Sequence, residues 1–539
     1  IESFIRSDSE RPVTAIPQIG ALSGHIPWLA TFVHELGFAV ELLRSKSSSL
    51  ALGEQLSNSF DSCGPVKIAH AVCDTSAQRL FLPKILSIAD PQGSGGQTCV
   101  SEQALPEMIE QSLKSRGKDV KVIRPRLSFA DGFDSPELLA NLMEIAGDLG
   151  VDPDRIGKAA EVAGRAQIQY EEGLAGIGQE ALDYARAHDL PSVVLCGHIH
   201  VVSDPSINAN IPLLLRQNGA MAIPMDCLPI ANDSATIEKI YWGDDRRYLR
   251  AAVAARQSAD VFPLLLASFG CGPCSFTEQI FQALLEGYPH TILESDGHGG
   301  AAGFVTRIQA FLQAVRQFIA QNDSVPACGG EKMRSYLDPL GAAGEQLSRD
   351  ALHVLLSAGE SMGETFAAVY RSFGYDAVAA PALSEVSIRY GKEDCSGKEC
   401  MSYQHLWGAF REYLENNPPQ RETRLMQLTG SFCRAGVYEY KDRMSIDKMG
   451  LSDKVSVVSL SFGSDPAMIV LMWAGLTALD ILRQCHLYHL AVQSHPGESD
   501  ELFHANVEEL IRILEVPMPE GEDPWAVGAD RKRKLAAAV

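Results

Sequence analysis

Hydrophobic positions change their spacing repeatedly along the chain, which predicts alternating helices and strands. Residues 28–36 place Trp28, Phe32 and Leu36 on one helical face, and the apolar segment 37–42 that follows predicts a strand. Longer amphipathic stretches predict helices over 136–188, 276–286 and 302–319. Further short apolar runs predict strands at residues 80–86, 120–123, 192–196, 220–225, 263–269 and 291–293. This alternation predicts α/β architecture, with several Rossmann-like doubly wound parallel-sheet domains.

The chain is too long for one hydrophobic core, since it has 539 residues. Residues 322–332 are polar and rich in glycine, and they form the best predicted linker. We therefore predict three domains, at 12–135, 136–322 and 333–539.

The second half repeats features of the first. A helix followed by glycine, an aromatic residue and a strand occurs before Gly37 and again before Gly374, at an offset of 337 residues (374 − 37). The same offset takes Cys63 to Cys400, and loosely takes Cys99 to within three residues of Cys433. Residues 333–539 are therefore predicted to be a degenerate repeat of the first half.

A cysteine pair follows one of the predicted strands. The apolar run 261–267 leads directly into Gly270-Cys271-Gly272-Pro273-Cys274. This pattern is typical of a buried strand that delivers a cysteine into a tight turn at its carboxyl end, where open α/β sheets bind ligands. A pair of this spacing can serve in redox chemistry or bind a metal.

The twelve cysteines do not predict a disulfide framework, because the chain is large and shows no secretory pattern. Those on apolar segments are interpreted as core residues: Cys73, Cys196, Cys227 and Cys485. Five lie at polar, glycine or proline turns, where helix N-termini can stabilise thiolates, and are predicted metal or iron–sulfur ligands: Cys63, Cys99, Cys271, Cys400 and Cys433. Cys274, Cys328 and Cys395 stay open.

Other patterns limit the function. The excess of 68 acidic over 46 basic residues, a net charge of −22, argues against a nucleic acid or an anionic membrane as the main partner. The most apolar segment, 467–478, is too short to span a bilayer and predicts a buried helix. We expect a cytoplasmic protein. The Gly197-His198-Ile199-His200 run suits a metal pair, a phosphate-facing loop or an ordinary loop, and neither a Walker motif nor Gly-x-Gly-x-x-Gly after a strand is present.

Several motifs together resemble the family of proteins related to 2-hydroxyacyl-CoA dehydratase and its activase. They are Gly270-Cys271-Gly272-Pro273 with Ser275-Phe276, then Glu294-Ser295-Asp296-Gly297-His298, then Thr306-Arg307-Ile308-Gln309-Ala310-Phe311, and upstream Cys63-Gly64-Pro65-Val66-Lys67-Ile68-Ala69-His70. The chain departs from the family pattern at Cys274, where aspartate is usual, and at His198-Ile199-His200, which stands in place of Arg-Pro-Tyr. The ATPase domains often found ahead of this region are absent from the sequence.

The resemblance implies an iron–sulfur cofactor, of the [4Fe-4S] or double-cubane type, in an interdomain cleft. It implies that Cys63, Cys99 and Cys271 hold one cluster and that Cys400 and Cys433 are ligands in the second half. Cys395 or Cys274 would then complete a set of six thiolate ligands. It also places Lys67, His70, His198, Glu294, Asp296 and His298 near the cleft. Of these, His70, His298 and Glu294 are the catalytic candidates, and Lys67, Asp296 and His198 the cofactor-binding ones.

Two functions follow from the resemblance. The first is an iron–sulfur oxidoreductase or dehydratase-type component from an anaerobe, which accepts low-potential electrons from a separate ATP-hydrolysing activase. The second is a non-catalytic scaffold or maturation partner of another enzyme subunit. From the residues alone, an α/β protein with a structural zinc ion is a third interpretation.

Overall fold

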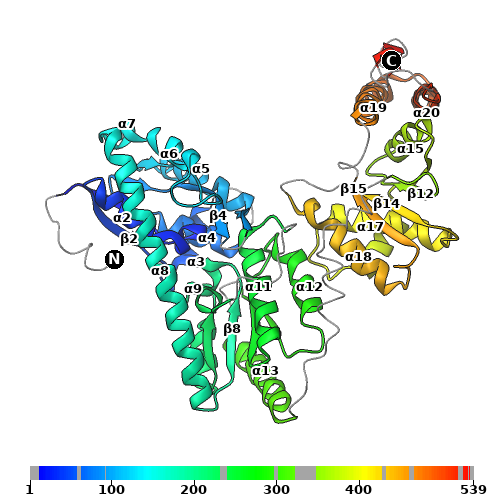
Figure 1. The fold of residues 1–539 in the computed structure, drawn as a ribbon. Coiled ribbons are helices and arrows are strands. Elements are labelled where there is room, and N and C mark those ends of the chain that lie inside the picture. The colour runs from blue at the N-terminus through cyan, green and yellow to red at the C-terminus, as the bar shows by residue number, and fades with distance from the viewer. Residues whose placement is uncertain are drawn as a thin grey trace. The chain divides into compact units, whose positions relative to one another are not determined.

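The structure is a computed structural model, and it describes most of the chain in two compact units, Ile1–Met333 and Arg334–Val539 (Figure 1). Each unit is described by itself. The described residues are 11–57, 62–90, 93–230, 240–295, 301–321, 347–427, 433–459, 466–519, 526–527, 529–531 and 533–534. The predicted linker at 322–332 lies outside these ranges.

The first sheet is fully parallel, in the order β2-β1-β3-β6. Its strands are β1 (Val13–Pro17), β2 (Ala39–Leu43), β3 (Arg79–Phe81) and β6 (Lys121–Ile123). The chain passes from β1 outward to β2 and then returns to β3 on the other side, which is the doubly wound arrangement. Its helical elements are η1 (Gly20–His25), α2 (Ile26–Glu35), α3 (Ser49–Leu56), α4 (Gly64–Val72) and α5 (Val100–Ser115). The fully buried rings of Trp28 and Phe32 anchor α2 in the core, as the helical pattern predicts.

The predicted strand at 80–86 is two strands in two different sheets. After β3, the chain turns into β4 (Lys84–Asp90), which pairs with β7 (Arg126–Ser128) and with β5 (Gly93–Gln97) in a second, three-stranded sheet. Residues 92–99 are rich in glycine and polar residues, which is typical of a flexible link, yet β5 occupies most of this segment. A Cβ on Gly96 would lie 2.2 Å from the Cα of Gly243, so glycine serves close backbone packing here.

The third sheet has the parallel order β11-β10-β8-β9. Its strands are β8 (Ser192–Cys196), β9 (Met221–Pro224), β10 (Val261–Ser268) and β11 (Thr291–Ser295), close to the predicted runs. Helices α11 (Gly243–Ser258) and α12 (Cys274–Leu284) pack on β10, and Figure 1 shows α11 beside β8. The remaining helical elements of this unit are α6 (Pro136–Met143), α7 (Ala146–Leu149), α8 (Pro153–Ala187), α9 (Ile199–Ser203), α10 (Ile211–Gln217), η2 (Met225–Cys227) and α13 (Ala301–Gln321).

Helix α8 connects the two halves of the first unit. It has 35 residues and packs against α2 at one part and against η2 and β9 at another (Figure 1). Gln167 is buried on this helix, donates to the carbonyl of Gly24 at 2.9 Å and accepts from the backbone N–H of Trp28. The helix therefore ties the first sheet layer to the third sheet.

The second unit contains a parallel sheet in the order β13-β12-β14-β15, which matches β2-β1-β3-β6 strand for strand. Its strands are β12 (Leu352–Leu355), β13 (Asp376–Ala379), β14 (Thr423–Gln427) and β15 (Val455–Ser459). Its helical elements are α15 (Met362–Ser372), α16 (Glu385–Glu393), α17 (Met401–Asn416), η3 (Arg434–Val437), α18 (Tyr438–Lys448), α19 (Pro466–Val492) and α20 (Glu498–Glu515). All four sheets are thus flanked by helices and are mostly parallel, as the sequence predicts.

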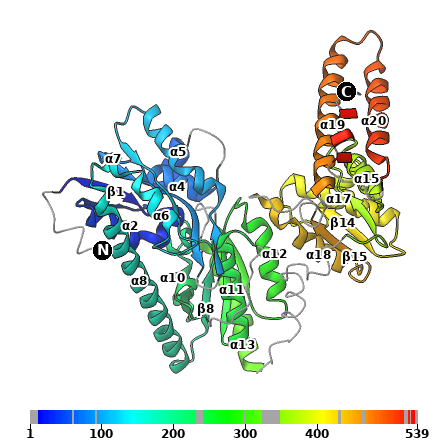
Figure 2. The same ribbon diagram turned by 45° about the horizontal axis from the view of Figure 1, so that its top comes forward.

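Helix α19 is longer and more exposed than the predicted buried helix at 467–478. Figure 2 shows it beside α20, and it also packs against α15. Its segment Ala467–Val492 is long and apolar enough to cross a membrane by length and composition, with 39% of its most apolar window buried. Trp473, Leu487 and Tyr488 are each about two-thirds exposed or more, at 67%, 66% and 73%.

A glycine allows two helices to cross closely in each unit. A Cβ on Gly53 of α3 would lie 1.9 Å from the carbonyl oxygen of Lys67 on α4, and a Cβ on Gly391 of α16 would lie 1.8 Å from that of Gln404 on α17. Real Cβ atoms do not approach backbone oxygens this closely, so an alanine at either site forces the helices apart.

We predict that Gly53→Ala lowers the free energy of unfolding by about 1–3 kcal/mol, because the added methyl group overpacks a backbone contact. Urea unfolding followed by tryptophan fluorescence measures this. Gly173→Ala on α8 is the matched control, since its Cβ meets nothing within 4 Å. The control is expected to gain about 0.5–1 kcal/mol from helix propensity.

His25 makes the first unit sensitive to acid. Its ring stacks on Phe129 with centroids 4.6 Å apart, and Nδ1 lies 2.9 Å from the carbonyl oxygen of Ala21. Burial lowers the pKa of His25 from 6.5 to about 4. The unfolded chain therefore binds a proton between these pH values that the folded chain does not, and stability falls as pH drops from 6.5 to about 4.

We predict that His25→Gln removes part of this acid sensitivity, up to about 3 kcal/mol between pH 6.5 and pH 4. Urea unfolding at a series of pH values measures it. His495→Gln, at an exposed position of the second unit, is expected to leave the acid sensitivity unchanged. Equal slopes for His25→Gln and the unmodified chain would contradict the prediction.

Candidate functional site

Three cysteines from distant segments of the first unit come together at helix N-termini. Cys63 is the residue before α4, Cys99 is the residue before α5, and Cys271 lies in the turn between β10 and α12. All three are half-buried. Cys271 follows β10 at the carboxyl edge of a parallel sheet, whereas Cys99 follows β5, which runs antiparallel to β4, and Cys63 follows helix α3. Their meeting therefore depends on how these segments pack together.

The electrostatics of the thiols show that they are neighbours. Burial raises the pKa of Cys63 to about 12, with Cys271 and Cys99 adding to the shift. Burial also raises the pKa of Cys99 to about 11, with Glu102 and Cys271 adding to it. Negative charge on these sulfurs is therefore unfavourable unless a cation stands among them.

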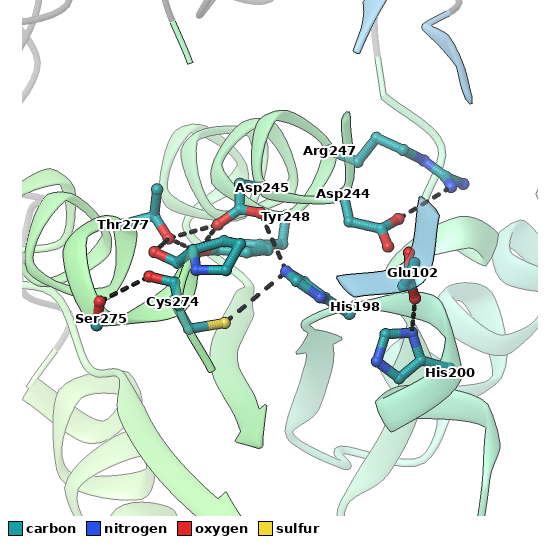
Figure 3. A network of polar contacts seen from close by, with 12 residues as sticks. Glu102, His198, His200, Asp244, Asp245, Arg247, Tyr248, Cys274, Ser275 and Thr277 are labelled. Atoms are coloured by element: carbon teal, nitrogen blue, oxygen red, sulfur yellow. Dashed lines mark hydrogen bonds and ion pairs between the residues drawn. The ribbon is translucent and has the colours of Figure 1, made fainter. Parts of the chain in front are cut away.

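Cys271 and Cys274 form a close pair with His198. The two sulfurs and a ring nitrogen of His198 all lie within 4.8 Å of one another. Cys274 Sγ is 3.8 Å from His198 Nε2 (Figure 3). A hydrogen bond from Cys274 lowers the pKa of Cys271 to about 7, against the effect of burial, while the same bond and burial raise the pKa of Cys274. These three side chains can hold a single metal ion.

The backbone positions His198 through Gly197, at the end of β8. Gly197 has a φ of +145°, and a Cβ there would lie 2.4 Å from the carbonyl oxygen of Leu266 on β10, so glycine is required. His198 follows and precedes α9. Its Nε2 lies 3.0 Å from Asp245 Oδ2. Burial alone would lower the pKa of His198, but Cys271 and Asp245 outweigh burial and hold that pKa well above 6.5.

Asp245 is a fully buried carboxylate that holds this arrangement together. It lies on α11, and its Oδ1 accepts hydrogen bonds from the hydroxyls of Tyr248 and Thr277. Figure 3 shows Asp245 between these hydroxyls and His198, with the sulfur of Cys274 and Asp245 both directed at the same ring nitrogen, Nε2, of His198. The carboxylate thus joins α11, α12 and the end of β8 in one polar network.

A second polar group lies beside the first. His200 Nδ1 is 3.1 Å from Glu102 Oε1, and ligand atoms of His198, His200 and Asp244 lie within 4.8 Å of one another. Burial alone would raise the pKa of Glu102, but His200 and His198 outweigh it and lower that pKa. Burial raises the pKa of Asp244. Glu102 lies three residues after Cys99, so this group adjoins the cysteines.

Of the other residues predicted for this site, three lie within the described residues and two outside them. Lys67 forms an ion pair with Glu54 at 3.4 Å. His70 is buried in the last turn of α4, where burial and Arg116 lower its pKa, whereas Cys63 precedes the first turn. Glu294 lies on β11. Asp296 and His298 fall outside the described residues.

The second unit has its own cysteines at equivalent kinds of position. Cys400 precedes α17 and Cys433 precedes η3. Cys400 Sγ lies 2.9 Å from the hydroxyl of Tyr438, whose pKa is raised by burial, by Cys400 and by Cys433. Cys395 has its pKa raised to about 12 by burial and by Glu399.

The predicted division between core and turn cysteines holds with one exception. Cys73, Cys196 and Cys227 are buried, as predicted. Cys485 is exposed, so its interpretation as a core residue is wrong. It lies on α19, where an apolar sequence does not imply burial because part of the helix has no protein covering it.

The sequence patterns do not point to the carboxylates of this site, Asp244, Asp245 and Glu102. Asp244 and Asp245 stand in a Gly-Asp-Asp-Arg-Arg run that is typical of a solvated helix start, yet both are buried. Glu102 follows Cys99 within one helical turn, which is the only local signal that links it to the site. The pairing of each acid with a histidine depends on contacts between distant segments.

A comparison with models of protein families shows which family the N-terminal part of the chain resembles. The CoA enzyme activase uncharacterised domain (DUF2229) matches residues 15–228. The match covers 214 residues (228 − 15 + 1), less than half of the chain, and over these residues the chain is similar to this activase-related domain. The match confirms the resemblance stated above, and this activase-related domain contains Cys63, Cys99, His198 and His200 but ends before Cys271. No curated protein and no solved structure matches the chain.

We predict that Glu102→Gln costs about 1–3 kcal/mol of stability, because it leaves the buried His200 without the charge of its half-buried partner. Urea unfolding measures the loss, and a double-mutant cycle with His200→Gln isolates the pair. Glu161→Gln is the control, since Glu161 pairs with Arg165 at an exposed position and is expected to contribute only about 0.3–0.5 kcal/mol. Equal losses at the two positions would contradict the buried pair.

Proposed function

We propose that the chain is an iron–sulfur protein of the 2-hydroxyacyl-CoA dehydratase and activase superfamily. In this proposal Cys63, Cys99 and Cys271 hold one cluster, of the [4Fe-4S] or double-cubane type. The observation that carries it is the convergence of these three half-buried thiols at helix N-termini. The activase-related match over 15–228 supports the assignment.

The donor set fits such a group. Thiolates are the usual ligands of iron–sulfur clusters, and helix N-termini and backbone N–H groups stabilise their charge. Cys271 and Cys99 raise the pKa of Cys63, and Cys271 raises the pKa of Cys99. Iron bound to these sulfurs in place of protons would relieve this crowding of negative charge. A polynuclear cluster stands between its ligands, so its sulfurs lie farther apart than those around a single ion.

When bound, the cluster supplies one-electron transfer at low potential. The chain's own residues surround it with charge: His198 offers a cation next to Cys271, while Asp245 and Glu102 balance the imidazoles. Burial of these groups excludes water and strengthens their interactions. We propose a cytoplasmic component that takes electrons from an ATP-hydrolysing activase for a reductive or dehydration-type reaction, with a non-catalytic scaffold for another enzyme subunit as the alternative.

We further propose that residues 333–539 arose as a repeat of the first half. The shared strand order and the paired helix crossings at Gly53 and Gly391 support this. Cys400 and Cys433, both beside Tyr438, are the corresponding ligands, with Cys395 as the sixth thiol of the proposal. Cys400 and Cys433 each precede a helical element, as Cys63 and Cys99 do.

Roles for the remaining polar residues complete the proposal. His70, His298 and Glu294 are proposed to transfer protons, and Lys67 and Asp296 to contact the cofactor region. The position of His70 at the far end of α4 from Cys63 argues for a structural role for this histidine. His198 has the strongest support, because it contacts Cys274 and lies among the cysteines.

A single zinc ion is the competing interpretation. His198, Cys271 and Cys274 lie within 4.8 Å of one another, which suits one tetrahedral ion with two thiolates and an imidazole. This set uses Cys271 and Cys274 and leaves out Cys63 and Cys99. Metal analysis therefore separates the two interpretations.

We predict that the protein purified or reconstituted without oxygen contains iron and sulfide and gives an EPR signal after reduction. Iron, sulfide and zinc analysis of the full chain measures this. Cys63→Ala, Cys99→Ala and Cys271→Ala are each expected to lose most of the iron bound in the first unit. A tightly bound zinc ion without iron would overturn the proposal.

Two cysteines outside the set serve as controls. Cys485→Ala removes an exposed thiol and Cys73→Ala a core thiol, and both are expected to retain the iron. Equal iron retention in Cys271→Ala and Cys485→Ala would refute the proposed ligand set.

A further inference from the structure

The turn between β10 and α12 brings two thiols together at the start of a helix. Cys271-Gly272-Pro273-Cys274 begins three residues after the last residue of β10, and Cys274 is the first residue of α12. Their sulfurs lie within 4.8 Å of each other, and the two thiols are hydrogen-bonded. A Cys-x-x-Cys segment between a strand and a helix is the arrangement of thiol–disulfide exchange proteins.

The two thiols differ in access. Cys271 is half-buried, whereas Cys274 is only 4% exposed. The surface beside Cys271 is open: a Cβ on Gly270 would meet nothing within 4 Å, and Phe269 is 66% exposed. An incoming disulfide can therefore reach Cys271 first, with an exposed ring beside it for apolar contact.

We propose that Cys271 and Cys274 are a thiol–disulfide exchange pair, with Cys271 as the attacking thiol and Cys274 as the resolving thiol, acting on low-molecular-weight or protein disulfides. This activity goes beyond cluster binding and depends on Cys274. Cys271 takes part in both activities, so it cannot bind the cluster while it forms a disulfide with Cys274.

The exchange balances in two steps. The Cys271 thiolate attacks one sulfur of the external disulfide, whose S–S bond breaks to release one thiolate and leave a mixed disulfide on Cys271. Cys274 then attacks the Cys271 sulfur, forms the internal disulfide and releases the second thiolate. The protons of both cysteines end on the two released thiols, so the pair is oxidised by two electrons and the external disulfide is reduced by two.

The buried network holds the resolving cysteine in place. Thr277, one turn after Cys274, donates to Asp245, and Asp245 in turn holds His198 against Cys274. His198 Nε2 lies 3.0 Å from Asp245 Oδ2 and 3.8 Å from Cys274 Sγ, so the imidazole fixes the position of that sulfur. The network therefore presents Cys274 to Cys271 and not to solvent.

The test uses the full chain after chelation of metals, equilibrated with mixtures of reduced and oxidised glutathione and then alkylated. Trypsin releases residues 257–307, a fragment with Cys271 and Cys274 and no other cysteine. The expected result is that this fragment changes from two alkylated thiols to one internal disulfide as oxidised glutathione increases, and returns to two thiols on reduction. A fragment that stays fully alkylated at every ratio overturns the proposal.

Three variants sharpen the result. Cys274→Ser is expected to trap glutathione on Cys271, whereas Cys271→Ser is expected to lose both the internal disulfide and the trapped adduct. Absence of the adduct in Cys274→Ser overturns the assignment of Cys271 as the attacking thiol. Cys99→Ala is expected to lose iron under the cluster proposal but to keep the internal disulfide. The iron content of this variant therefore tests the cluster, and its disulfide tests the exchange pair.

Discussion

The site depends on the carboxyl edges of parallel strands. Because parallel strands end at the same edge of a sheet, the turns that follow them, and the N-termini of the next helices, gather there. In the first unit this rule brings His198, after β8, and Cys271, after β10, to one edge of the third sheet, and Cys63 and Cys99 meet Cys271 from the N-termini of α4 and α5. Helix α8 packs against elements of both halves of the first unit and so holds the two halves together.

Close backbone approach is the second constraint on this packing. Gly96 and Gly243 bring β5 against the start of α11, and Gly197 brings the end of β8 against β10. Side chains at these positions would push α11 and His198 away from the cysteines. The glycines therefore have a direct effect on the chemistry, since Asp245 enters the site on α11.

The polar network explains why the buried charges are tolerated. Asp245 accepts two hydroxyl hydrogen bonds and pairs with His198, and Glu102 pairs with His200. Unpaired, either carboxylate would be strongly destabilising in the interior. The same pairing places an imidazole beside Cys274 and thereby connects the thiol pair to the rest of the site.

Much of this protein follows from its sequence. Apolar runs between helical patterns determined the strands β8 and β10, because a strand buried on both faces must be continuously apolar. Turn residues placed Cys63 and Cys99 before helices, since glycine, proline and polar residues mark such boundaries locally. Only the tertiary structure decided that β5 occupies a glycine-rich segment, that Cys485 is exposed, that Asp245 is buried beside His198, and that Glu102 pairs with His200. These outcomes depend on which distant segments pack together, and local sequence carries no record of the partner's position.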